Sequence, residues 1–268
     1  MPFIQAGDIR IYYEMTGQGQ RLLFINGTGG DLRNPLGPMQ SPLAKHFNLL
    51  GYDQRGLGQT DKPDRPYTMR DYADDAARLL NAVGWRRCHV IGYSFGGMVA
   101  QEFAIRHPER IDRLVLCVTS PGGAGGASYP LHELGKLGSE ERARRGIALA
   151  DLRRTPEWQA NHPDEVAQFI GQALAAERAH ADEPGWAEGR AHQLEARRHH
   201  DTFDRLDRIS APTLVCGGRY DGIALAATQE RMAARIPGAE LRMFEGGHLF
   251  VMQDKSAYPA IIEWLQAG

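Results

Sequence analysis

The chain has 268 residues, of which 42% are hydrophobic and 24% charged, and its formal net charge is −2. This composition is typical of a globular protein that can bury a large core in one α/β domain. No long basic run and no apolar run of about 20 residues is present, so the sequence predicts neither a nucleic-acid partner nor a membrane span. The N-terminus lacks the pattern of a signal peptide, and we expect a cytoplasmic protein.

The three cysteines, Cys88, Cys117 and Cys216, lie in or beside apolar, strand-like runs. Free cysteine is among the residue types most often buried. We therefore predict that they are core residues and neither disulfide partners nor ligands, which fits a reducing compartment.

Short apolar runs bounded by turn residues predict the strands of a sheet. Continuous runs of this length are typical of strands buried on both faces, as in a parallel sheet. Residues 9–14 alternate in part, which predicts a half-exposed antiparallel strand that pairs with the first few residues. The continuous runs are Leu22–Ile25, Leu49–Leu50, Val90–Ile91, Leu114–Val118 and Thr213–Cys216.

Helical patterns separate these strands. One has Thr68 as a plausible cap, Asp71 three places on, and apolar residues at helical spacing up to Val83. A second is predicted over 95–106 and ends before Pro108, because the residue before proline avoids helical geometry. Strands that alternate with helices predict a parallel, doubly wound α/β sheet. Two further helices are expected over 225–236 and 256–266.

The stretch 122–205 breaks this alternation. It opens with a glycine-rich run and contains no strand-like segment, only polar and helix-like ones around 140–152 and 164–178. It is too long for a loop of a compact domain, so we predict a helical cap inserted between late strands. The predicted domains are a core formed by 1–121 and 206–268, and a cap formed by 122–205.

The run Gly92–Gly96 is the most informative segment. It matches the Gly-x-Ser-x-Gly nucleophile elbow, with an apolar strand before it and a helical pattern after it. The elbow is a sharp turn that raises the hydroxyl of Ser94 above the sheet, so the residues two before and two after the serine must be small. The following helix directs backbone N–H groups at developing negative charge. Ser94 is therefore the predicted nucleophile.

In this arrangement the acid and then the base follow the serine along the chain. Asp221 comes after a buried strand and a glycine turn, and His248 after the strand-like run 241–244 and two glycines. Taken alone, Asp221 could be a turn residue and His248 a helix cap. Their order and their places at strand ends favour a triad. In it His248 takes the proton of the serine and returns it to the leaving group, and Asp221 orients the imidazole ring of His248.

The run 24–31 follows the third predicted strand, where the second oxyanion donor belongs. We assign the two donors to the backbone N–H groups of Thr28 and Phe95. A dinucleotide-binding loop is disfavoured, because Leu32 stands where the third glycine would be required.

In the predicted cap, one lysine and ten arginines stand against fourteen acidic residues, so no strongly basic pocket is evident. Trp158 and Trp186 are candidate substrate-binding residues; the alternative, which we favour, is that they anchor the cap in the core. Six histidines lie in this region without a His-Glu-x-x-His pattern, so we expect no metal and no cofactor.

With these residues in place, the chain resembles the α/β-hydrolase fold family over nearly its whole length. The run 51–61 is similar to the family's Asp-x-Arg-Gly-x-Gly-x-Ser loop, with Thr60 in place of the serine. Asn26 replaces the histidine of the usual His-Gly pair and is expected to hydrogen-bond locally. The runs 67–75 and 29–33 are similar to those of 3-oxoadipate enol-lactonases.

The resemblance implies a serine hydrolase that cleaves a small ester or lactone through an acyl-enzyme on Ser94. A C–C bond hydrolase, an acyltransferase and a low-turnover ligand-binding receptor could use the same triad. Epoxide hydrolases and haloalkane dehalogenases are disfavoured, because they carry aspartate at the position of Ser94. The expected partner is a small-molecule substrate; the oligomeric state stays open.

Overall fold

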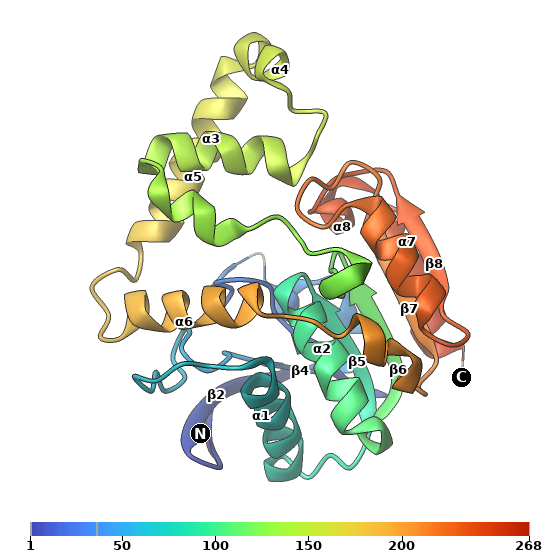
Figure 1. Ribbon diagram of the computed structural model, residues 1–268. Helices are drawn as coiled ribbons and strands as arrows, with labels where there is room; N and C mark the ends of the chain where they lie inside the picture. The colour runs from blue at the N-terminus through green and yellow to red at the C-terminus, as the bar shows by residue number, and fades with distance from the viewer. Residues whose placement is uncertain (1, 36, 268) are drawn as a thin grey trace.

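The computed structural model describes residues 2–35 and 37–267, and within them the strands form one eight-stranded sheet (Figure 1). The strand order is β1-β2-β4-β3-β5-β6-β7-β8. β1 and β2 pair with each other in antiparallel fashion, β2 pairs with β4 in the same way, and all later pairs are parallel. The predicted fold class is confirmed. The strands are β1 (Phe3–Ala6), β2 (Ile9–Thr16), β3 (Arg21–Ile25), β4 (Asn48–Tyr52), β5 (Cys88–Tyr93), β6 (Ile111–Cys117), β7 (Thr213–Gly218) and β8 (Glu240–Phe244).

Helices cover both faces of this sheet, and each face has its own hydrophobic cluster. On one face lie α1 (Met69–Ala82), α2 (Phe95–Arg106) and α7 (Ala226–Arg235). On the other lie α8 (Phe250–Gln253) and α9 (Ala257–Gln266). Since β5, β6 and β7 are buried along nearly their whole length, their continuous apolar runs are explained by burial on both sides.

The start of α1 agrees with the sequence in detail. Thr68 accepts a hydrogen bond from the backbone of Asp71, and the Asp71 carboxylate accepts one from the backbone of Thr68. This reciprocal capping box uses N–H groups that would otherwise lack a partner at the first turn. The short 3-10 helices are η1 (Pro38–Gln40), η2 (Pro42–Lys45), η3 (Pro108–Arg110), η4 (Gly123–Gly125), η5 (Leu131–Lys136) and η6 (Phe203–Arg208).

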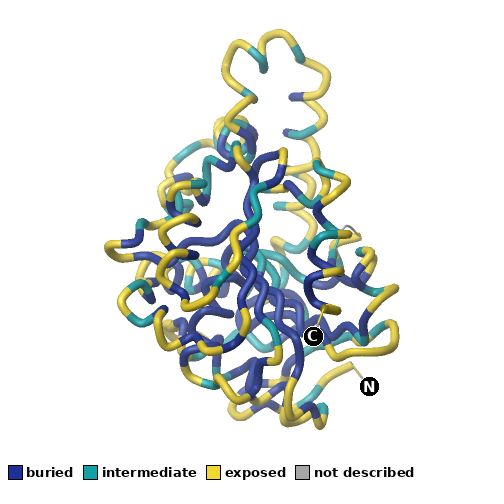
Figure 2. The backbone as a smooth tube through the Cα atoms, turned by 90° about the vertical axis from the view of Figure 1, so that its right-hand side faces the viewer, coloured by how far each residue is buried: buried dark blue, intermediate teal, exposed yellow. Residues whose placement is uncertain are grey.

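Between β6 and β7 the chain forms the helical insertion, with α3 (Ser139–Ala150), α4 (Pro156–Asn161), α5 (Pro163–Arg178) and α6 (Trp186–Arg198). α3 to α5 form an arm above the sheet, and its residues are mostly exposed (Figures 1 and 2). The boundaries at 122 and 205 stay a prediction; η6 runs across the second one. Residues 1 and 268, the ends of the predicted core, lie outside the described residues.

The sequence did not predict α4, α6 or α8. For α6 the reason is physical: the side directed at the core carries polar residues, with Gln193 and Arg197 buried there in place of an apolar stripe. Helix prediction depends on that stripe, since polar residues on both sides give no periodic signal.

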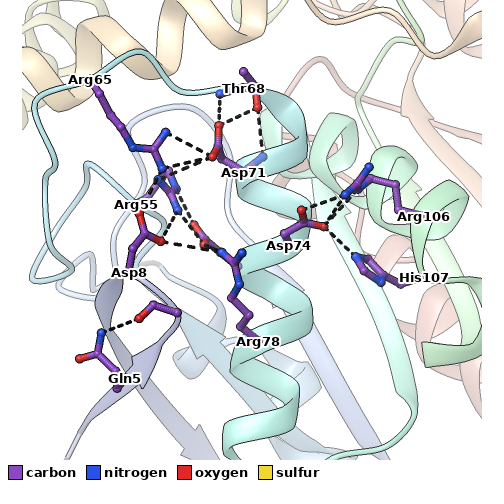
Figure 3. Close-up of polar contacts among 12 residues, drawn as sticks. Gln5, Asp8, Arg55, Arg65, Thr68, Asp71, Asp74, Arg78, Arg106 and His107 are labelled. Atoms are coloured by element: carbon purple, nitrogen blue, oxygen red, sulfur yellow. Dashed lines mark hydrogen bonds and ion pairs between the residues drawn. The ribbon is translucent and has the colours of Figure 1, made fainter.

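A cluster of charged residues joins α1 to the N-terminal hairpin and to the loop after β4 (Figure 3). At its centre Arg55 is fully buried, and its Nε and Nη2 atoms donate to the two carboxylate oxygens of Asp75 at 2.6 and 2.8 Å. Asp8 Oδ1 lies 3.5 Å from Nη2 of Arg55, and Asp71 Oδ1 lies 4.0 Å from its Nη1. Burial alone would lower the pKa of Arg55, but the hydrogen bonds and charge of Asp75 raise it above its usual value.

All three cysteines are free and buried, as predicted. In the part of the chain that the structure describes, no helix is both long enough and apolar enough to cross a membrane.

Candidate active site

Ser94 lies between β5 and α2 in a conformation that few non-glycine residues adopt, with φ 56° and ψ −114°. Its backbone N–H donates to the carbonyl of Cys117 on the neighbouring strand at 2.8 Å. Such strain in a turn between a buried strand and a helix is what a nucleophile elbow requires. The side chain is 6% exposed and lines a cavity.

The two glycines of the elbow are required by close packing. A Cβ atom on Gly92 would collide with the carbonyl oxygen of Gly96, and one on Gly96 would collide with the carbonyl oxygen of Ile25. The expectation that both positions must be small therefore has a direct structural basis.

The structure brings the three predicted triad residues together at the carboxyl ends of the strands. His248 Nε2 lies 3.0 Å from Ser94 Oγ, and His248 Nδ1 lies 2.8 Å from Asp221 Oδ2. Asp221 is buried, and its second oxygen accepts from the backbone N–H groups of Ile223 and Ala224 at 2.8 and 3.0 Å. Asp221 thus also acts as the turn residue that the sequence left as an alternative.

The carbonyl of His248 accepts a hydrogen bond of 2.5 Å from the hydroxyl of Tyr93, the residue before the nucleophile. The loop that carries the histidine is therefore tied directly to the elbow.

The end of α3 holds both loops that carry the acid and the base. The carbonyl of Leu149 accepts from Gly222 at 3.0 Å, and that of Ala150 accepts from the backbone of His248 at 2.6 Å. The backbone N–H of Leu152 in turn donates to the carbonyl of Tyr220 at 2.8 Å. The sequence carried no signal for these contacts, because backbone groups of any residue type can make them.

The loop after β3 is fixed by two glutamines. Gln54 donates to the carbonyl of Asn26 at 2.9 Å, and Gln193 of α6 accepts from the N–H of Gly29 at 2.8 Å. The amide nitrogen of the Asn26 side chain is buried without a hydrogen-bond partner among the described residues. The sequence did not single out Gln193, because its helix was not predicted.

The two predicted oxyanion donors lie in different surroundings. Thr28 lines the same cavity as Ser94. Phe95 begins α2 directly after Ser94, and its ring packs edge-on against Tyr72 with centroids 5.0 Å apart. The Phe95 side chain therefore belongs to the core, so any contribution of this residue to chemistry comes from its backbone.

The cavity beside Ser94 and His248 has a volume of about 390 Å³, which lies within the usual range for a small-molecule site. It extends along the face of the sheet that α9 covers. Polar groups gather near the elbow, where Asn26 and Thr28 lie. The apolar part of the wall includes Phe24, Leu43, Ile91, Cys117, Val251 and Ile261.

Neither tryptophan of the insertion is among the described residues that line this cavity. Trp158 packs against the small cluster formed by Ile147, Val166 and Ile170, and its ring stacks on His162 at 4.3 Å. Trp186 lies against the guanidinium of Arg190 at 4.5 Å. The structure therefore gives no support to a substrate-binding role for either tryptophan and places Trp158 in the packing of the arm.

Within residues 2–35 and 37–267, no group of three or more His, Cys, Asp or Glu side chains is arranged to hold a metal ion.

The family model for the α/β hydrolase fold matches residues 20–255. The chain belongs to the α/β-hydrolase fold family. A poly(3-hydroxyalkanoate) depolymerase of Ectopseudomonas oleovorans is 30% identical to it over 255 residues, which cover 91% of this chain and 84% of that protein. The family and such relatives support a hydrolase activity.

Two solved structures have the same fold as this chain. A hydrolase from Pseudomonas aeruginosa PA01 is 29% identical with a TM-score of 0.77, and the match covers 99% of this chain and 98% of the other. The enol-lactonase of Burkholderia xenovorans LB400 has a TM-score of 0.79, with 23% identity and full coverage of both chains. The family resemblance inferred from the sequence is confirmed.

Proposed function

We propose that this chain is a serine hydrolase that cleaves a small carboxylic ester or lactone through an acyl-enzyme on Ser94. The observation that carries the proposal is the chain of contacts from Ser94 to His248 at 3.0 Å and from His248 to Asp221 at 2.8 Å, beside a largely apolar cavity. This is the geometry of a nucleophile, a base and a group that orients the base.

In the first half-reaction, His248 Nε2 takes the proton of the Ser94 hydroxyl while Oγ attacks the carbonyl carbon of the substrate. Asp221 keeps the proton on Nδ1 of the imidazole and stabilises the imidazolium that forms. The backbone N–H groups of Thr28 and Phe95 are the proposed donors to the oxyanion; each such donor is worth about a hundred- to a thousandfold in rate.

Collapse of the tetrahedral intermediate breaks the bond to the leaving oxygen, which takes the proton from His248. With an ester the alcohol departs; with a lactone it stays attached to the acyl group. Water then attacks the acyl-enzyme, again with His248 as base, and releases the acid and Ser94.

The size and polarity of the cavity favour a short or medium apolar acyl group, with the polar carbonyl at the end near Asn26 and Thr28. The relatives support the same chemistry: one is named for the hydrolysis of a polyester and one for the opening of an enol-lactone.

A fluorophosphonate probe tests the proposal directly. The protein should be labelled at Ser94, as located by peptide mass spectrometry, and should turn over 4-nitrophenyl butyrate or a simple lactone. Ser94→Ala should lose labelling and on the order of a million-fold in turnover, whereas Ser210→Ala, a surface change, should retain both. Labelling without turnover of esters, lactones or a vinylogous diketone would indicate a receptor, and turnover of the diketone alone a C–C hydrolase.

A further inference from the structure

A second, smaller pocket lies where the chain leaves β6 and meets η5 and α6. Its volume is about 80 Å³, room for a group of a few heavy atoms, since one water occupies about 30 Å³ in the liquid. Two of its lining residues lie near the nucleophile elbow or its neighbouring strand in sequence. Met98 is in the first turn of α2, and Ser120 follows Cys117, the last residue of β6, by three positions.

The wall of this pocket is basic. Among the described residues that line it there is no aspartate or glutamate, whereas it contains Arg197, Arg198, His132, His200, Ser120 and Ser128. Arg198 and His132 have carboxylates of their own, Glu195 at 3.7 Å and Glu133 at 3.4 Å.

Arg197 has no such partner in the part of the chain that the structure describes. Its side chain is 6% exposed, and Nη1 donates to the carbonyl of Tyr129 at 2.8 Å. Nε and Nη2 are buried and form no hydrogen bond with the described residues. These two atoms make up one edge of the guanidinium, the edge by which Arg55 holds both oxygens of Asp75.

Two more polar atoms in this wall lack a partner among the described residues. The hydroxyl of Ser120 is buried and unbonded. His200 Nε2 lies 3.1 Å from the carbonyl of Ser120, while its Nδ1 is buried without a partner. Burial lowers the pKa of His200 to about 3, so the ring is neutral and Arg197 provides the positive charge here.

A buried guanidinium without a counter-charge is costly, because a charge taken out of water is stabilised only by a paired charge and hydrogen bonds. A bound water could accept one of the free N–H groups, but it would not neutralise the charge. An anion with two oxygens in one plane would meet both requirements.

We propose that this pocket binds a compact monoanion of the carboxylate type through the Nε and Nη2 edge of Arg197, with the Ser120 hydroxyl as a further donor. The site does not depend on the proposed hydrolysis. The carboxylate can be a free anion or the remote end of a substrate whose ester group reaches Ser94.

Acetate is the probe. Isothermal titration at constant ionic strength should show saturable binding of sodium acetate to the intact protein, with about one site. Arg197→Gln should weaken that binding about ten- to hundredfold, the usual effect of losing hydrogen bonds to a charged group. Arg197→Lys should keep part of it, because the charge stays but the planar fork is lost.

Arg144→Gln is the matched control in the same insertion, since that arginine is exposed and pairs with Glu140. If Arg197→Gln fails to fold, Ser120→Ala tests the site instead. The carbonyl of residue 120 keeps its contacts with Gln101 and His200, so the fold should be retained. The affinity for acetate should fall severalfold. Ser94→Ala should bind acetate like the wild type, so failure of the hydrolase proposal would leave this result intact.

Two outcomes overturn the proposal: no saturable acetate binding to the wild-type protein, or binding that neither Arg197→Gln nor Ser120→Ala changes. Steady-state kinetics identify the source of the anion. If the substrate supplies it, acetate competes with a half-ester of a dicarboxylic acid, and Arg197→Gln raises KM for that half-ester more than for a neutral ester of equal length. If the anion is free, acetate binds without competition.

Discussion

Two buried arginines in this protein are held in different ways. Arg55, in the core next to α1, is fully buried and shares both oxygens of Asp75, with Asp8 and Asp71 nearby (Figure 3). Arg197, on the core-facing side of α6, is nearly as buried. Within the described part of the chain, however, its guanidinium donates a hydrogen bond to one carbonyl only, that of Tyr129. Asp75 raises the pKa of the first above its usual value, and burial lowers the pKa of the second to about 10.

The difference separates a buried charge whose counter-charge is built into the fold from a buried charge that has no counter-charge among the described residues. The Ser94, His248 and Asp221 contacts and the Arg55 cluster are closed sets in which each charged or reacting side chain contacts a partner side chain, although Arg55 Nη1 itself forms no hydrogen bond with the described residues. The core-facing side of α6 has unpartnered polar atoms on Gln193 and Arg197. Removal of one member of a closed set should therefore cause a larger loss than a change on α6.

The largest effect is expected for Asp221→Asn, which keeps the shape but removes the charge that orients His248. An amide can force the imidazole into the wrong tautomer, so ester turnover should fall by up to roughly ten-thousand-fold while the fold is kept. Initial rates with 4-nitrophenyl butyrate measure this. Asp64→Asn is the control, since that carboxylate is 94% exposed; a near-normal rate for Asp221→Asn would mean that another group orients the histidine.

Asp75→Asn should have the largest effect on stability. It leaves the buried guanidinium of Arg55 with only the more distant carboxylates of Asp8, 3.5 Å from Nη2, and Asp71, 4.0 Å from Nη1, among the described residues. Loss of the bidentate partner should cost up to about 3–5 kcal/mol of unfolding free energy. Urea unfolding followed by circular dichroism gives the value. Asp112→Asn, which breaks an exposed pair with Arg87, should cost about 0–1 kcal/mol. Equal losses for the two variants would show that the cluster contributes no more than a surface pair.

A smaller effect is expected for Gln193→Met. The N–H of Gly29 then loses its acceptor, so the loop that carries Thr28 is held less firmly and kcat should fall roughly tenfold. KM should change little, and the phosphonate should still label Ser94. Gln172→Met on the exposed side of α5 is the control. A Gln193→Met protein with wild-type kcat would show that Gln54 alone fixes this loop.

The insertion contacts the loops that carry two members of the predicted triad. All three residues of the predicted triad come from the predicted core segments, and the end of α3, in the insertion, accepts hydrogen bonds from both the Asp221 and the His248 loops. The charge count of the insertion did not reveal the Arg197 pocket. Several of its carboxylates, such as Glu140 and Glu177, pair with arginines elsewhere in the insertion, and a count over 84 positions averages over them.

The sequence by itself determined the sheet, the elbow and the order of Ser94, Asp221 and His248, because these depend on signals that are local in the chain. Buried strands appear as apolar runs, and tight turns appear as glycines whose missing Cβ atoms are required by close packing. Only the tertiary structure decided how the insertion packs on the core. The core-facing side of α6 is polar, so the helix lacks the apolar stripe by which a sequence pattern is recognised. The sequence shows Trp158 only as a large aromatic residue, and its packing in the arm is visible only in the structure. Contacts such as Gly29 with Gln193 join residues far apart in sequence, and neither residue type predicts its partner.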